Sequence, residues 1–269
     1  MLDRVDQDAD HPGHAPLVTA PRLQAVAPLD GPTDRMGFGE ALASMAADWQ
    51  QAAVADYSRL ADIVSGAVGL VPGCEHAALV VYDDRQQLVA KAVSGPETAP
   101  MIALQNELKE GPCRQTAATN MVMRAADVLT DRRWPRFAPR ARQLGIGSML
   151  CTPLLAGHRS YGSLSMASGT PDAFDEESES LAAIFAAHAA IALADAERLD
   201  TLRLALDSRD LIGQAKGILM ERYGLSADAA FRVLVRESQT TNTKLRAVSE
   251  SLCWTGALPS GQPPRLESP

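Results

Sequence analysis

Apolar residues recur with helical periodicity over long stretches of the chain, and they form short, partly β-branched runs in between. The helical pattern covers residues 38–71, 101–108, a segment opening at Pro112, 133–144 and 175–222. The apolar runs predict strands over residues 77–82, 88–93, 121–125, 148–155 and 161–167, with Asp83 and Asp84 as the turn of a hairpin between the first two. This order predicts an α+β fold in which a layer of helices packs on an antiparallel sheet.

The longest helical pattern, from Asp175 to Arg222, contains no proline and is interrupted only by Gly213 and Gly217. A periodic helix much longer than about 25 residues usually pairs with another helix. We therefore expect the helix over residues 178–222 to connect two parts of the chain and to form a homodimer. The alternative is an amphipathic helix folded back on its own domain.

The end of that helix and the residues after it carry three short helical stripes separated by turns. The stripes are Leu211, Ala215, Ile218 and Leu219; Ala230, Phe231 and Leu234; and Leu245, Val248 and Leu252. Between them, cationic and amide side chains occupy positions that a core cannot use. A unit this small with that pattern is expected to hold a ligand on its surface.

Three motifs in this region stand in the order and spacing of a known family. They are Gln214-Ala215-Lys216-Gly217-Ile218-Leu219-Met220, the pair Ala230-Phe231, and Asn242 with Lys244-Leu245-Arg246. The last fifth of the chain therefore resembles the ANTAR domain, a small helical RNA-binding module of bacterial transcription antiterminators. The resemblance implies, as ligand, paired stem-loops in nascent mRNA. One position departs from the family: Val235 stands where an arginine is usual, and the basic residue follows as Arg236, about 100 degrees further round the helix.

Eight residues of this unit are candidates for RNA contact: Arg209, Lys216, Gly217, Arg222, Gln239, Asn242, Lys244 and Arg246. Asn242 is expected to cap the third helix, which would place Lys244 and Arg246 at an N-terminal end that suits a bound anion. Gly217 inside a helix costs about 1 kcal/mol against alanine, which indicates the close approach of either a base or another helix. Arg222 ends its helix, where a cation either suits the helix dipole or contacts a phosphate.

The net charge of −8 by itself disfavours a nucleic-acid ligand. Its distribution changes that picture, because between Thr201 and Cys253 eight Lys and Arg stand against six Asp and Glu, giving this segment +2 and the rest of the chain −10. A phosphate-binding domain needs local positive charge only. A balance of +2 favours a small contact with shape or unpaired bases over a broad grip on phosphates.

The middle of the chain resembles a second family. The likeness rests on Glu110-Gly111-Pro112-Cys113, Asp131 to Pro135, Pro153-Leu154, Gly162 and Ala173-Phe174-Asp175. Over about residues 56–193 these residues resemble a GAF domain, a sensory module, in the form that actinobacterial antiterminators carry in front of ANTAR. The resemblance implies a space between sheet and helices that accepts an unknown small-molecule ligand. A purely structural core is the alternative.

Together the patterns predict four parts of the chain. These are a disordered, proline-rich N-terminal tail over residues 1–37, a GAF-like sensor domain over 38–194, an ANTAR-like RNA-binding domain over 195–254 and a disordered C-terminal tail over 255–269. The fold class is α+β, with an N-terminal GAF-like antiparallel sheet with helices, a long connecting helix and a C-terminal three-helix ANTAR-like unit. No secretory signal or long uninterrupted apolar run is recognisable, so we expect a cytoplasmic protein.

The sequence shows none of the common catalytic motifs. It has no phosphate loop, GxSxG, HExxH or dinucleotide-binding turn, so we expect no enzyme, no cofactor and no metal site. The four cysteines, Cys74, Cys113, Cys151 and Cys253, lack CxxC spacing and are expected to be free thiols. Cys113 at a helix start supplies the competing hypothesis of a GAF-type redox enzyme.

These observations favour a dimeric cytoplasmic transcription regulator. It would bind RNA stem-loops through the ANTAR-like unit and act by antitermination under the control of the GAF-like sensor. A DNA-binding regulator is one alternative. A protein-interaction module whose ANTAR-like end no longer binds RNA is another, motivated by Val235.

Overall fold

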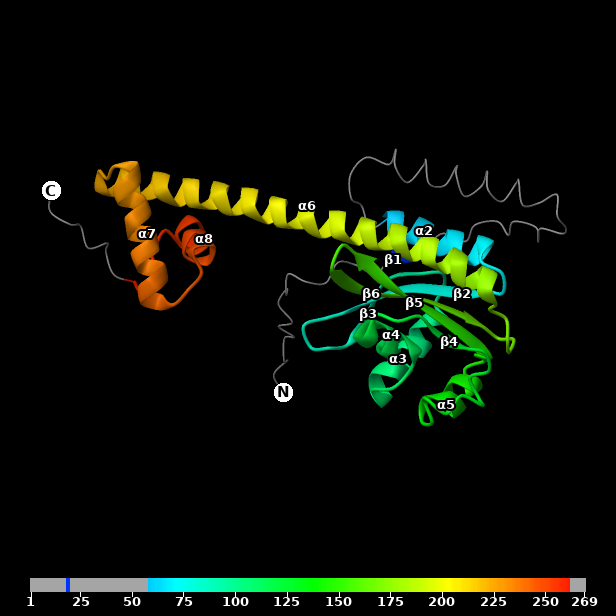
Figure 1. Ribbon diagram of the computed structural model, residues 1–269. Helices are drawn as coiled ribbons and strands as arrows, with labels where there is room; N and C mark the ends of the chain where they lie inside the picture. The colour runs from blue at the N-terminus through cyan, green and yellow to red at the C-terminus, as the bar shows by residue number, and fades with distance from the viewer. Residues whose placement is uncertain (1–17, 20–57, 262–269) are drawn as a thin grey trace, which may run out of the picture. The chain divides into compact units, whose positions relative to one another are not determined.

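The computed structural model describes residues 18–19 and 58–261, and the chain divides into two compact units between Ala196 and Glu197. One helix, α6 (Glu176–Tyr223), begins in the first unit and ends in the second (Figure 1). The helical pattern that the sequence shows over residues 38–57 lies outside the described residues, as does most of the tail predicted over 1–37.

The first unit alternates helices and strands in the predicted order. Its helices are α2 (Ser58–Leu70), α3 (Thr98–Leu108), α4 (Pro112–Thr119), α5 (Phe137–Gln143) and the first part of α6. Its strands are β1 (Val18–Thr19), β2 (His76–Tyr82), β3 (Leu88–Val93), β4 (Met123–Ala125), β5 (Ser148–Ala156) and β6 (Arg159–Ser168). Asp83 forms the predicted hairpin turn, because its Oδ1 accepts hydrogen bonds from the N–H groups of Arg85 and Gln87 at 2.9 and 2.7 Å.

The strands form one sheet in the order β1-β3-β2-β6-β5-β4. Four of the neighbouring pairs are antiparallel, and β1 pairs parallel with β3. Strand β1 lies inside the segment predicted to be a disordered tail, so that prediction is wrong at these two residues. Without β1 the outer edge of β3 would present unpaired backbone groups, and a Val-Thr pair suits the extended conformation that satisfies them.

Helices cover both faces of this sheet, with α2 and the first part of α6 on one side and α3, α4 and α5 on the other (Figure 1). Strand β2 shows why: Ala77 and Leu79 belong to the first core, and Ala78 and Val80 belong to the second. The sequence pattern predicts a single layer of helices. An uninterrupted apolar run such as 77–81 is typical of a strand buried on both faces, and the structure therefore adds a second layer.

Glu110, in the GAF-like motif, ties the second layer together. Its Oε1 accepts hydrogen bonds from the backbone N–H groups of Arg136 and Phe137, at 2.7 and 3.0 Å, and so caps the start of α5. Arg140 of α5 forms two hydrogen bonds to the Glu107 carboxylate of α3, at 2.5 and 3.0 Å. These hydrogen bonds from Arg140 hold the pKa of Glu107 below its ordinary value.

The second unit consists of the end of α6, α7 (Ala227–Thr241) and α8 (Leu245–Thr255), as the three stripes predict. Its core is small and contains Ala215, Leu219, Ala230, Leu234, Val248, Leu252 and Leu258. Leu258 falls in the tail predicted from residue 255 and is buried, so the tail prediction begins too early. The packed structure extends past α8 because Leu258 completes this core.

The turns of the second unit follow two capping rules. Ser226 opens α7, and its hydroxyl accepts a hydrogen bond from the N–H of Ala229 at 3.3 Å. Asn242 ends α7 in the left-handed conformation, with φ at 51°, and its N–H donates to the carbonyl of Ser238. The prediction that Asn242 caps α8 is therefore wrong, and Lys244 occupies that position. Asparagine tolerates the left-handed conformation better than most residues, which suits it to the end of a helix.

By length and composition alone, α6 is apolar enough to cross a membrane. However, 56% of its most apolar window is buried within the protein. The residues responsible include Ala182, Phe185, Ala186 and Ala189, which pack in the first core against α2 and the sheet. The apolar character of this part of α6 is therefore explained by its packing in a protein core.

Candidate nucleic-acid interface

The eight predicted contact residues fall in three places of the second unit. Arg209, Lys216 and Gly217 lie along α6, Arg222 lies at its end, and Gln239, Asn242, Lys244 and Arg246 lie around the turn between α7 and α8. Only two of the eight, Arg209 and Lys216, line the same described groove.

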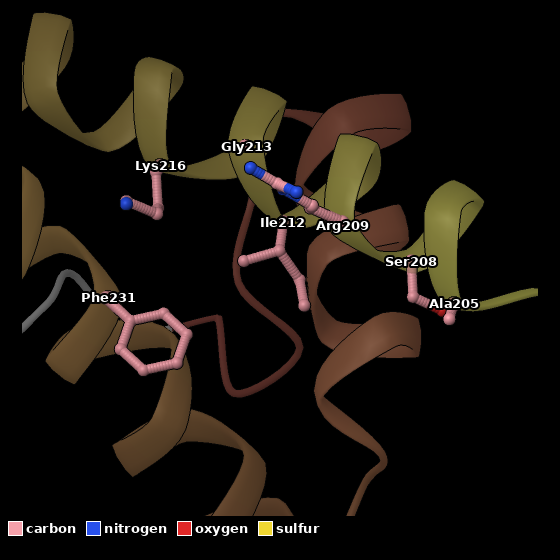
Figure 2. Close-up of a pocket in the computed structure, with 7 residues that line it drawn as sticks. All are labelled: Ala205, Ser208, Arg209, Ile212, Gly213, Lys216 and Phe231. Atoms are coloured by element: carbon pink, nitrogen blue, oxygen red, sulfur yellow. The ribbon is translucent and has the colours of Figure 1, made fainter. Parts of the chain in front are cut away.

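The groove between α6 and α7 has a volume of about 450 Å³. Its lining consists of Ala205, Ser208, Arg209, Ile212, Gly213, Lys216 and Phe231 (Figure 2). Six of these lie on successive turns of one face of α6, and Phe231 comes from α7. Two of the seven lining residues are cationic and none is acidic, so this hollow of the unit favours an anionic ligand.

Phe231 is the residue that the sequence analysis placed wrongly. It was assigned to the apolar stripe of α7, but 39% of its surface is exposed. The core positions of α7 are Ala230 and Leu234, four residues apart, and Phe231 lies one residue round from the first. Figure 2 shows Lys216 extending from α6 on the side of the ring, and its Nζ lies 6.0 Å from the ring centroid. A helical wheel centred on Ala230 and Leu234 would have identified Phe231 as flanking the core.

Gly213 and Gly217 lie four residues apart on α6, and both are exposed. A Cβ atom built on either glycine meets no atom within 4 Å. Close packing against another helix within this unit therefore does not explain Gly217, which was one of its two predicted roles. Gly213 lines the groove, and Gly217 does not.

Arg222 has a structural partner. Its Nη1 donates a hydrogen bond to the carbonyl of Gly256, which follows the end of α8. It also lines a second hollow of about 260 Å³ together with Leu219, Tyr223, Leu252, Gly256, Ala257, Leu258 and Gly261. This arrangement ties the end of α6 to the end of α8, which is neither of the two roles predicted for Arg222.

The turn between α7 and α8 presents a polar surface. Gln239, Asn242 and Lys244 are exposed, and Arg246 is half-buried. The Nε atom of Arg246 is buried and has no hydrogen-bond partner within the described part of the chain. The family's usual arginine position, Val235, is half-buried on α7, and the neighbouring Arg236 is exposed.

Away from this interface, the first unit contains two buried thiols close together. The Sγ atoms of Cys113 and Cys151 lie 3.7 Å apart, and both residues are completely buried. Hydrogen bonds with Cys151, Ser165 and Gln105 lower the pKa of the Cys113 thiol, whereas burial raises the pKa of the Cys151 thiol. All four cysteines are free. A redox enzyme has to bring its substrate to the sulfur, and the packing around these two leaves no exposed surface for that.

Among the described residues, no group of three or more His, Cys, Asp and Glu side chains is arranged to hold a metal ion. The candidate interface contains cations, an aromatic ring and amides. Such groups bind phosphates and bases.

Comparisons with known proteins bear on both units. The family model of the GAF domain matches residues 55–194, and that of the ANTAR domain matches residues 200–252. No curated protein matches the chain. These two domain matches confirm the two resemblances seen in the sequence.

Solved structures resemble the first unit at low identity. A GAF domain of a phosphoenolpyruvate-protein phosphotransferase from Coxiella burnetii is 18% identical, with a TM-score of 0.49 over 62% of this chain and 98% of that one. The corresponding domain from Acinetobacter is 15% identical, with a TM-score of 0.47 over 61% and 98%. A type II free methionine-R-sulfoxide reductase from Thermoplasma acidophilum is 17% identical, with a TM-score of 0.42 over 51% and 90%.

The assignment of both domains rests on the two family models. A GAF domain followed by an ANTAR domain is an architecture typical of regulatory proteins. The chain belongs to the GAF domain family and carries an ANTAR domain after its GAF domain.

Proposed function

We propose that this protein is a transcription regulator that binds RNA stem-loops through its ANTAR domain. The observation that carries the proposal is the groove between α6 and α7, whose lining contains the cations Arg209 and Lys216, an exposed aromatic ring and no acidic side chain. A positive surface with an aromatic ring suits unpaired loop bases and their phosphates. The segment's net charge of +2 suits a contact of this small size.

Binding of paired stem-loops in nascent mRNA would act by antitermination, because a protein that holds these loops prevents a terminator hairpin from forming. The GAF domain would control this activity in response to an unknown small-molecule ligand. The protein would act in the cytoplasm, where nascent bacterial mRNA is found.

We also propose that the protein is a homodimer through α6, within the predicted range 178–222. Leu199, Leu202 and Leu206 are spaced three and four residues apart, so they share one face of the helix. Leu202 and Leu206 are 59% and 61% exposed, so this face of α6 presents apolar surface that a second copy of the chain could bury. A dimer would present two ANTAR domains to two stem-loops, and linked binding would raise the affinity.

The RNA proposal is tested by titrating a paired-hairpin RNA with the full chain at fixed salt. We expect Arg209→Ala and Lys216→Ala each to weaken binding by about fivefold to tenfold, the loss of one charge-assisted contact. Arg232→Ala is the matched control, because Arg232 is an exposed cation of the same unit outside the groove lining.

Equal losses for all three variants would indicate non-specific charge attraction rather than a contact in the groove. Competition with duplex DNA separates the proposal from the DNA-binding alternative. If the duplex displaces the hairpin at equal concentration, the specific RNA function is wrong.

A further inference from the structure

Phe231 is an exposed aromatic ring with no evident role in the fold. The second core contains Ala230 and Leu234 of α7 but not Phe231, although a ring of this size is normally the first side chain to be buried. Its neighbour across the groove, Lys216, places its Nζ 6.0 Å from the ring centroid. The ammonium group therefore lies over the ring at the outer limit of a cation–π contact, and it has to move aside when a base stacks there.

The groove beside this ring is open because one of the lining residues on α6 is a glycine. Gly213 contributes no side chain, and a Cβ atom there would meet nothing within 4 Å. The hydroxyl of Ser208 is occupied, since it donates to the carbonyl of Leu204 at 2.6 Å. The other groups of the lining that can bind a polar or aromatic ligand are the ring of Phe231 and the cations of Arg209 and Lys216 (Figure 2).

The volume of about 450 Å³ falls within the range of small-molecule sites. An aromatic face binds a nucleobase by stacking, whatever the base, and flanking cations bind the phosphates on either side of it. A protein segment would find only positive charge in this lining and no acceptor to pair with its own cations.

We propose that this groove is a base-binding subsite: a single unpaired base of an RNA loop stacks on Phe231, and Arg209 and Lys216 bind the adjacent phosphates. The inference rests on the proposed RNA function and extends it to one nucleotide and one side chain. The ANTAR unit then binds an RNA loop through one unstacked base as well as through the phosphates of the RNA backbone.

The experiment uses the full chain and a paired-hairpin RNA in which each loop nucleotide in turn is replaced by an abasic one. Phe231→Leu keeps an apolar side chain of similar volume but removes the stacking face, and we expect it to lower the affinity about tenfold. Phe231→Tyr keeps the face and should bind as the original protein does. At one loop position, the abasic RNA should lose affinity with the original protein and lose nothing further with Phe231→Leu.

A second variant approaches the groove from the other helix. Gly213→Leu fills the groove from α6 without meeting a neighbouring atom at its Cβ, and we expect the same loss of affinity as for Phe231→Leu. Circular dichroism measures whether each variant is folded. If Phe231→Leu does not fold, the RNA affinity of Gly213→Leu tests the subsite instead.

The outcomes separate this inference from the function on which it rests. If the original protein binds no hairpin RNA, both are overturned. If it binds but Phe231→Leu or, in a folded protein, Gly213→Leu retains full affinity, only the base-binding subsite is overturned. A change of oligomeric state by light scattering with unchanged RNA affinity would instead identify the groove as an interface between copies of the chain.

Discussion

The two units of this protein use their large apolar side chains in opposite ways. In the first unit, Trp134, Phe137, Phe174 and Phe185 are all buried, on both sides of the sheet. In the second unit, Phe231 is 39% exposed and Trp254 is 82% exposed, around a core of alanine, leucine and valine. The first unit therefore uses these aromatic side chains to build its interior, whereas the second unit leaves Phe231 and Trp254 at the surface, where a ligand can reach them.

Glycines of the two units show the same contrast. In β6, Gly162 has a φ of 138°, and a Cβ atom added there would lie 2.0 Å from the carbonyl oxygen of Val80 in the neighbouring strand. In α6, Gly217 has open space around it. The first glycine is required by close backbone packing, and the second is required by nothing within the described chain.

The sharpest test of this contrast is a pair of alanine substitutions. Gly162→Ala should lower the free energy of unfolding of the first unit by about 3 kcal/mol or more, because it combines a backbone clash with an unfavourable φ. Gly217→Ala should raise the stability of α6 by up to about 1 kcal/mol, because alanine is the better helix former. Urea denaturation followed by circular dichroism measures both.

If Gly162→Ala were tolerated, the sheet would have to be less tightly paired than the structure indicates. Gly217→Ala carries a second measurement, since a variant that is more stable but binds RNA less tightly would favour the close approach of a base at this position. Unchanged RNA affinity would remove Gly217 from the list of contact residues.

The exposed leucines of α6 extend the contrast to assembly. We expect the double substitution of Leu202→Glu and Leu206→Glu to weaken a homodimer by at least about tenfold. The reason is that two apolar side chains that the dimer would bury are replaced by charged ones. Leu204→Glu is the matched control: Leu204 is 46% exposed but lies about 160 to 200 degrees round the helix from the other two. Sedimentation or light scattering over a concentration series measures the change.

Equal weakening by Leu204→Glu would show that charge alone, rather than the stripe, disrupts the dimer. A protein that is monomeric before any substitution would contradict the dimer proposal itself. RNA affinity measured on the same samples shows whether linked binding contributes to it.

The smallest expected effect is at the start of α6. Asp175 Oδ1 accepts hydrogen bonds from the N–H and the hydroxyl of Ser178, both at 2.9 Å, and the backbone hydrogen bond lowers the pKa of Asp175. Asp175→Ala should lower the stability of the first unit by less than about 1 kcal/mol, since an exposed carboxylate is screened by solvent. RNA binding by the second unit should be unaffected.

The pH dependence of this contribution has a definite sign. Because the folded pKa is lowered, the carboxylate stabilises the fold above the unfolded value of about 3.9, and the stabilisation is lost as the pH falls through the folded pKa. The difference between the original protein and Asp175→Ala should therefore shrink below about pH 4. Asp175→Asn is the control, because it retains a capping oxygen but no charge. A stability difference between the original protein and Asp175→Ala that persists unchanged in acid would contradict the stabilising role of the Asp175 carboxylate.

Sequence patterns predicted most elements of the described chain, because each depends on local periodicity or on a turn residue. Gly145, for example, follows the end of α5 with a φ of 84°, as its place after the helical pattern suggests. The assignment failed where two local rules compete. Asn242 suits both a helix start and a left-handed helix end, and only the path of the chain into α8 selects the second.

The candidate site was predicted only in part for a related reason. Arg209 and Lys216 were identified because cations cannot belong to the core, but Phe231 was hidden among apolar residues that do. Arg222 had two possible roles by its position, and its hydrogen bond to the carbonyl of Gly256, 34 residues later, adds a third. A local sequence pattern does not predict a hydrogen bond between residues so far apart in the chain.

By itself, the sequence determined the two domain families, the order of their helices and strands and the location of the cations, because these follow from periodicity and from motifs with fixed spacing. The tertiary structure decided which face of each element is covered. It buried Cys113 beside Cys151 and left Phe231 exposed beside Lys216. Burial depends on residues distant in the chain that pack together, and no periodicity within one helix contains that information.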